Sequence, residues 1–103
     1  MSLSVKIKNR SADSIVIEMV GEVDFSTVDE VLVQIAQHRD QTISLDFSGV
    51  HFIDSTGIGL LLRSVMELRE DGGNITVETI PPYIMEILDE MGISDILHGL
   101  NGG

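Results

Sequence analysis

The most constraining feature of the chain is a change of hydrophobic period near its middle. Ile43, Leu45 and Phe47 are apolar at every second position, which is the pattern of a strand with one buried face. From Ile58 onward the apolar residues recur instead every three or four positions, as far as Val65, as they do in an amphipathic helix. The chain must therefore turn from a strand into a helix between these two segments.

Three short polar residues, Asp54, Ser55 and Thr56, lie at this turn. Their side-chain oxygens suit a helix N-cap, because they can accept hydrogen bonds from the first unpaired N–H groups. Gly57 and Gly59 predict that no side chain covers this end, which leaves the hydroxyls of Ser55 and Thr56 approachable and suited to carry a phosphate. From the local pattern alone, Ser55 is most simply an N-cap residue, and Asp54 serves equally well to cap the helix or to orient the Ser55 hydroxyl.

The rest of the chain repeats the same two patterns and predicts a single α/β domain over residues 1–103, with a frayed tail from about residue 99. Strands joined by crossover helices are parallel, so we expect an antiparallel N-terminal hairpin followed by parallel strands, flanked by helices. The predicted elements are strands at 3–7 and 15–20 joined by a turn over 9–13, a helix from 26 to 39 with Ser26 and Asp29 as a capping box, a strand at 75–78, a helix from 82 to 91, and a helical turn at 94–98.

Composition narrows the classes of partner. The chain of 103 residues has a formal net charge of -11, which disfavours nucleic acid and anionic membranes and favours a basic protein surface. It has no cysteine, so it offers no disulfide or thiolate site. No secretory leader opens the sequence and its apolar runs are too short to span a bilayer, so we expect a cytoplasmic protein.

Two segments carry a resemblance to a known family. Gly21-Glu22-Val23-Asp24, together with the nearly continuous run over residues 45–59, closely resembles the STAS domain of bacterial anti-sigma factor antagonists. The resemblance extends over almost the whole chain, and Ile58 stands where Leu is commoner in the family. It implies a STAS-like mixed sheet flanked by helices.

The same resemblance implies a function. Proteins of this family bind an anti-sigma factor that is typically also a serine kinase; phosphorylation switches them off and a PP2C-type phosphatase restores them. The serine after the aspartate is the phosphoacceptor, which is Ser55 here. Neither Lys nor Arg lies between Arg39 and Arg63 to neutralise a phosphate there. The expected partner-binding residues are Asp24, Asp54, Ser55, Thr56, Gly57, Ile58 and Gly59.

Other chemistries fit less well, and we expect no enzymatic activity, cofactor or metal. The chain lacks a dinucleotide fingerprint, a Walker lysine and a G-x-S-x-G nucleophile elbow. A receiver-like phospho-aspartate site built from Asp24, Asp46 and Asp54 is one alternative, but it needs a lysine near the acids, and Lys6 and Lys8 are both in the first strand. A STAS interaction module without a phospho-switch, in a transport or other signalling complex, is the other alternative.

Overall fold

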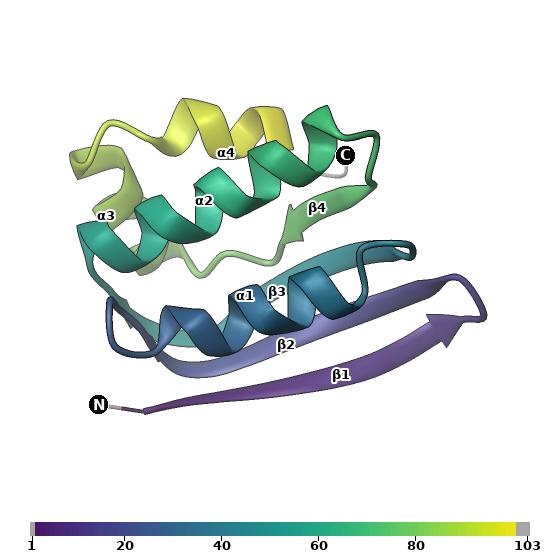
Figure 1. Ribbon diagram of the computed structural model, residues 1–103. Helices are drawn as coiled ribbons and strands as arrows, with labels where there is room; N and C mark the ends of the chain where they lie inside the picture. The colour runs from purple at the N-terminus through teal and green to yellow at the C-terminus, as the bar shows by residue number, and fades with distance from the viewer. Residues whose placement is uncertain (1, 101–103) are drawn as a thin grey trace.

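The computed structural model describes residues 2–100. In this part of the chain, strands and helices follow one another in the predicted order (Figure 1). They are β1 (Leu3–Ser11), β2 (Ser14–Val23), α1 (Val28–Gln37), β3 (Thr42–Ile53), α2 (Ser55–Glu70), β4 (Ile75–Glu78), α3 (Pro82–Glu90) and α4 (Ser94–Leu100).

The sheet has the strand order β1-β2-β3-β4, with β1 antiparallel to β2 and the later pairs parallel. This confirms the predicted mixed sheet. Helix α1 joins β2 to β3 and α2 joins β3 to β4, and both crossovers step in the same direction across the sheet. Because such crossovers are right-handed, α1 and α2 lie side by side on one face, as Figure 1 shows.

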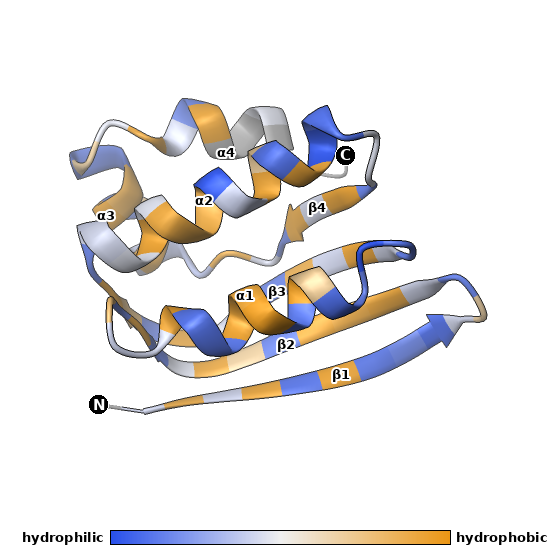
Figure 2. Cartoon of the chain, viewed as in Figure 1, coloured by the Kyte–Doolittle hydropathy of each residue, from blue (hydrophilic) through white to orange (hydrophobic). Residues whose placement is uncertain are grey.

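One hydrophobic core fills the space between this face of the sheet and the helices. Helices α1, α2 and α3 each contribute buried apolar residues at helical spacing, and Figure 2 shows orange segments alternating with blue ones along the helices. The core includes Ile15, Ile17 and Met19 of β2, Ile43, Leu45 and Phe47 of β3, Val28, Val31 and Ile35 of α1, Ile58, Leu61 and Val65 of α2, and Ile84 and Leu88 of α3.

The opposite face of the sheet is polar and carries three carboxylates side by side. Glu18 lies opposite Asp46, and Asp46 opposite Glu78, on adjacent strands. Like charges in directly opposed positions repel each other. Two cations of β1 offset this repulsion, because Lys8 Nζ lies 3.2 Å from Glu18 Oε2 and Arg10 Nη2 lies 3.1 Å from Glu78 Oε2.

Strand β3 contains two bulges relative to β2. While β2 advances from Glu18 to Val20, β3 advances from Asp46 to Gly49, one residue more. A second extra residue occurs in β3 between Val50 and Phe52. Bulges bend a strand and re-aim its side chains, so they set the direction in which β3 reaches the start of α2.

Strand β4 ends abruptly at Glu78. The next residue, Thr79, has a φ of 55°, in the left-handed region that β-branched residues rarely adopt. Pro81 and Pro82 follow, and Pro82 opens α3 as predicted, where its fixed φ and missing N–H are favourable.

Three strands extend beyond their predicted ends, and β2 continues past residue 20 to Val23. Strand β1 continues to Ser11, through most of the predicted turn, because it remains paired with β2. Strand β3 continues to Ile53 along β2, and the continuation includes His51. Pairing with a neighbouring strand thus overrides the local preference of polar residues for turns.

The first and last helices, α1 and α4, also differ from the predictions. Helix α1 begins at Val28 rather than Ser26, and its N-cap residue Thr27 makes no side-chain cap hydrogen bond, so the predicted capping box was wrong. Helix α4 extends to Leu100, into the segment predicted as a tail, and residues 101–103 lie outside the described residues. None of the described helices combines the length and apolar character needed to cross a membrane.

Candidate functional site at the start of helix α2

Asp54 joins two segments at the carboxyl end of the sheet. It is the N-cap residue of α2, with extended backbone angles, and its Oδ1 accepts a hydrogen bond of 2.6 Å from the Gly57 N–H. Its Oδ2 accepts a second hydrogen bond, of 3.4 Å, from the N–H of Phe25 in the loop between β2 and α1. Of the two roles considered for Asp54, the structure therefore shows helix capping.

Ser55 is the first residue of α2, and its side chain and that of Thr56 are exposed. At this position the unpaired N–H groups and the dipole of the helix favour a negative charge, by about 0.3–1 kcal/mol at an exposed site. The carboxylate of Asp54 opposes such a charge. Arg63, the next cation along α2, points to Glu67 instead, with 3.0 Å between Arg63 Nε and Glu67 Oε1.

The two glycines of this segment have different environments. Gly57 is buried, and a Cβ built on it would lie 2.6 Å from the Asp24 Cα, so only glycine lets α2 approach the β2–α1 loop this closely. A Cβ on Gly59 would meet nothing within 4 Å. Ile58 is also buried, in the core. Gly57 and Ile58 thus position the segment, while Ser55 and Gly59 lie on its surface.

Asp24 is buried and organises the β2–α1 loop. Its Oδ1 accepts hydrogen bonds from the Ser26 N–H (2.8 Å), the Ser26 hydroxyl (2.6 Å) and the Thr27 N–H (3.1 Å). The Thr27 hydroxyl accepts from the Asp24 N–H and donates to the Glu22 carbonyl oxygen. These bonds replace the expected capping box and fix the conformation of the loop.

The same bonds determine the charge state of Asp24. The Ser26 hydroxyl makes the largest contribution and, with the N–H groups of Ser26 and Thr27, holds the pKa of the carboxyl below its usual value of 3.8, although burial opposes this. Asp24 is therefore ionised at neutral pH. Within the described residues its Oδ2 is buried and accepts no hydrogen bond.

The structure separates the acids of the receiver-like alternative. Asp24 and Asp54 lie near each other, both beside Gly57. Asp46 lies eight residues before Asp54, and the part of β3 from Asp46 to Ile53 spans five residue steps of β2, about 17 Å by strand rise; the Oδ1 of Asp46 accepts the N–H of Ser48. Three carboxylates so placed cannot share one magnesium ion.

Sequence reasoning missed two residues near this site. Phe25 is the most exposed large apolar residue described, at 70%, and directly follows Asp24. Tyr83 of α3 donates a hydrogen bond of 3.0 Å from its hydroxyl to the carbonyl oxygen of Val50 in β3. An aromatic residue between polar loop residues was the available signal for Phe25, whereas no local pattern pairs Tyr83 with β3.

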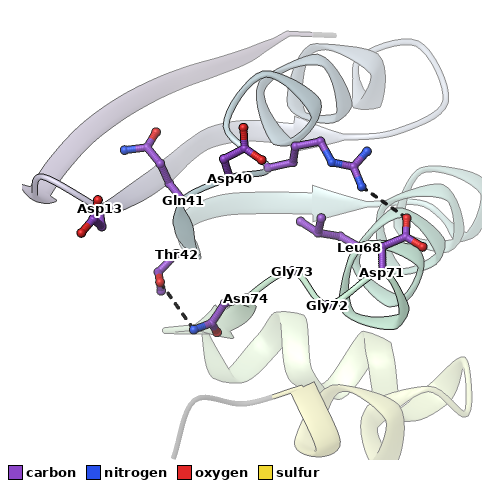
Figure 3. A pocket seen from close by; sticks show the side chains of 10 residues that line it. Asp13, Asp40, Gln41, Thr42, Leu68, Asp71, Gly72, Gly73 and Asn74 are labelled. Carbon is purple, nitrogen blue, oxygen red and sulfur yellow. Dashed lines mark hydrogen bonds and ion pairs between the residues drawn. The ribbon is translucent and has the colours of Figure 1, made fainter.

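A polar hollow of about 460 Å³ lies at the other end of the sheet, where β3 and β4 begin (Figure 3). At this hollow Arg39 Nη2 lies 3.3 Å from Asp71 Oδ2, and Figure 3 shows Asn74 reaching Thr42. Strand β3 runs from this hollow towards Ser55 and spans nine residue steps of β2, so the two are separated by roughly 30 Å. The hollow is therefore no part of the site at α2.

Comparison with known proteins gives a consistent result. The family model of the STAS domain matches residues 4–101. The anti-sigma-B factor antagonist of Listeria monocytogenes is 27% identical over 100 residues, which cover 94% of this chain and 88% of that protein.

Solved structures share the fold. The unphosphorylated form of the anti-sigma factor antagonist SpoIIAA has a TM-score of 0.70 at 23% identity, over 89% of this chain and 84% of SpoIIAA. Its phosphorylated form, from Bacillus, has a TM-score of 0.68 at 22% identity, over 95% and 88% of the two chains. The murine anion transporter Slc26a9 has a TM-score of 0.69 at 20% identity, over 84% of this chain but 15% of the transporter.

Proposed function

Because the chain belongs to the STAS domain family, we propose that it is an anti-sigma factor antagonist that phosphorylation of Ser55 switches off. The observation that carries the proposal is an exposed hydroxyl on the first residue of α2, directly after a capping aspartate. A fold neighbour, SpoIIAA, has been solved in both phosphorylated and unphosphorylated forms, which supports a phospho-switch on this fold.

The proposed partner is an anti-sigma factor that is also a serine kinase. Bound to the unphosphorylated protein, it would be unavailable to its sigma factor. The kinase would transfer the γ-phosphoryl group of ATP to Ser55 Oγ, releasing ADP and the hydroxyl proton, and a PP2C-type phosphatase would hydrolyse the phosphoserine. The protein itself acts by binding and not as an enzyme, and the proposal requires a cytoplasmic location, where sigma factors act.

The phosphate acts through charge. It adds about -1.5 to -2 charges beside Asp54, and Arg63 is engaged with Glu67. The phosphate thus stays uncompensated and has to be desolvated under a docked partner, which weakens the complex. The favourable helix dipole and the unfavourable Asp54 are comparable in size, so the fold survives the modification.

The docking face in this proposal is the exposed part of the segment. Ser55, Thr56 and Gly59 contact the partner directly, together with half-buried Asp54. Asp24, Gly57 and Ile58 are buried and contribute by holding that face in position. We therefore assign them a positioning role in partner binding.

Phosphorylation by the anti-sigma factor kinase of the same genome tests the proposal. Wild-type protein incubated with that kinase and ATP should gain one phosphate by mass spectrometry, and Ser55→Ala should gain none. Ser48→Ala, which removes another exposed hydroxyl outside the docking face, is the matched control and should be labelled like the wild type. Equal labelling of Ser55→Ala would reject the assignment.

Binding provides the second test. Ser55→Asp should weaken the complex with the anti-sigma factor while its circular dichroism spectrum stays that of the wild type. Loss of the folded spectrum would instead indicate a structural role for Ser55.

The second candidate function is that of a STAS module in a transport complex without a phospho-switch. The fold likeness to Slc26a9 favours it. It predicts that no kinase labels Ser55 and that Ser55→Ala and Ser55→Asp bind the partner equally, so the two experiments above discriminate between the candidates.

A further inference from the structure

Phe25 is an apolar side chain presented to solvent next to the switch serine. Its ring is 70% exposed, more than any other large apolar residue described. Its N–H donates to Oδ2 of Asp54, the residue directly before Ser55. The hydrogen bond places Phe25 and Ser55 on neighbouring parts of one surface, at the carboxyl end of the sheet.

The loop that carries Phe25 is held rigidly. On one side of Phe25, Asp24 is fixed by the hydrogen bonds from Ser26 and Thr27. The backbone of Asp24 also packs against Gly57 of α2, and the space between them is too small for a Cβ on Gly57. An aromatic side chain on an ordered loop loses little backbone entropy when a partner covers it, which is the property of a binding hot spot.

The charged residues near Phe25 in the sequence are acidic. Residues 11–38 and 40–62 contain no Lys or Arg, while Glu22, Asp24 and Asp29 flank Phe25 along the chain and the Asp54 carboxylate accepts its N–H. A complementary partner surface would therefore be basic at its rim and apolar where it receives the ring.

We propose that Phe25 is the apolar anchor of the Ser55 face and inserts into a pocket of the anti-sigma factor that is lined by apolar residues and rimmed by Lys or Arg. This rests on the proposed function for the identity of the partner. It adds a second determinant of binding that is distinct from Ser55 and independent of phosphorylation.

Titration of the purified anti-sigma factor with full-length variants tests the proposal. Phe25→Ala should raise the Kd at least tenfold, and Phe25→Leu should lie between it and the wild type. Val20→Ala is the matched control, because Val20 is also an exposed apolar residue, at 52%, but belongs to the polar face of the sheet, and its Kd should stay within twofold. The ring of Phe25 is exposed, so the thermal midpoint of Phe25→Ala should equal that of the wild type.

Each other outcome has a definite meaning. If the wild type binds the anti-sigma factor and the Kd of Phe25→Ala is within twofold of the wild-type Kd, the role of Phe25 as an anchor is overturned and the proposed function stays intact. A wild type that does not bind at all overturns the proposed function and the anchor with it. If the Kd does not rise as NaCl is added, the partner has no basic rim around its pocket. If the wild type is a dimer and Phe25→Ala is a monomer, the ring serves self-association and the anchor is overturned.

Discussion

The backbone of Asp24 lies directly against Gly57, so that a Cβ on Gly57 would come within 2.6 Å of the Asp24 Cα. This contact joins the loop after β2 to the first turn of α2, and the hydrogen bond from the Phe25 N–H to Asp54 joins them a second time. The surface that presents Ser55 is therefore built from the β2–α1 loop and the first turn of α2, which are packed as one unit.

Gly57→Ala should disrupt this unit. The added methyl group has to displace backbone atoms, so we expect a loss of about 1–3 kcal/mol in the free energy of unfolding, measured by urea denaturation. Gly59→Ala is the matched control, since its Cβ meets nothing within 4 Å, and it should gain about 0.5–1 kcal/mol from better helix propensity. Equal effects of the two substitutions would contradict the close approach described here.

The cap of α2 should depend on Asp54. Asp54→Ala removes both acceptors and should lower the free energy of unfolding by about 0.5–2 kcal/mol, whereas Asp54→Asn keeps a capping oxygen and should cost less. Asp71→Ala, which breaks an exposed ion pair with Arg39, should change stability by less than about 0.5 kcal/mol. Denaturation of the three variants under one condition checks this order.

Acid should unfold the protein partly through Asp24. Its pKa is lower in the folded state than the usual 3.8, so its stabilising contribution is present above that pH and is lost as the pH falls through the folded-state pKa. Asp24→Asn should lower the thermal midpoint at pH 6, and its difference from the wild type should shrink as the pH falls below about 4. A difference that stays constant from pH 6 to pH 2 would show that Asp24 is not the titrating group.

Replacing Thr79 should relieve backbone strain. Its positive φ costs a β-branched residue about 1–2 kcal/mol, and its side chain is exposed. Thr79→Asn should therefore raise the free energy of unfolding by about 1 kcal/mol, because Asn tolerates this conformation. The same exchange at Thr76, within β4, should bring no gain.

The order of strands and helices could be predicted because each of them has its own local hydrophobic pattern. The period change after Phe47 gave the strand and the helix, and Pro82 and Gly92 marked the limits of α3. The exposed position of Ser55 followed from the same reasoning and agrees with the structure. These features depend on residues close in sequence, which a periodicity argument can read.

The features that were not predicted depend on contacts between distant segments. Asp24 and Gly57 are 33 residues apart in the sequence, and the residues around each of them do not indicate that their backbones are in contact. Gly57 was expected to leave the hydroxyls open; in the structure it also lets the first turn of α2 pack against the β2–α1 loop. The capping box at Ser26 failed because Asp24 already accepts the hydrogen bonds of that turn.

The two bulges of β3 make the length of this strand as important as its composition. At each bulge β3 contains one residue more than β2, which resets the alternation of its side chains, so that Val50 faces the core although an even alternation from Phe47 would place it outside. The regular part of β3, between Ile43 and Asp46, has no spare residue, so a deletion there would exchange inward and outward positions on one side of the gap. A length change in that part would therefore disturb the approach of β3 to Asp54 and Ser55 without altering either residue.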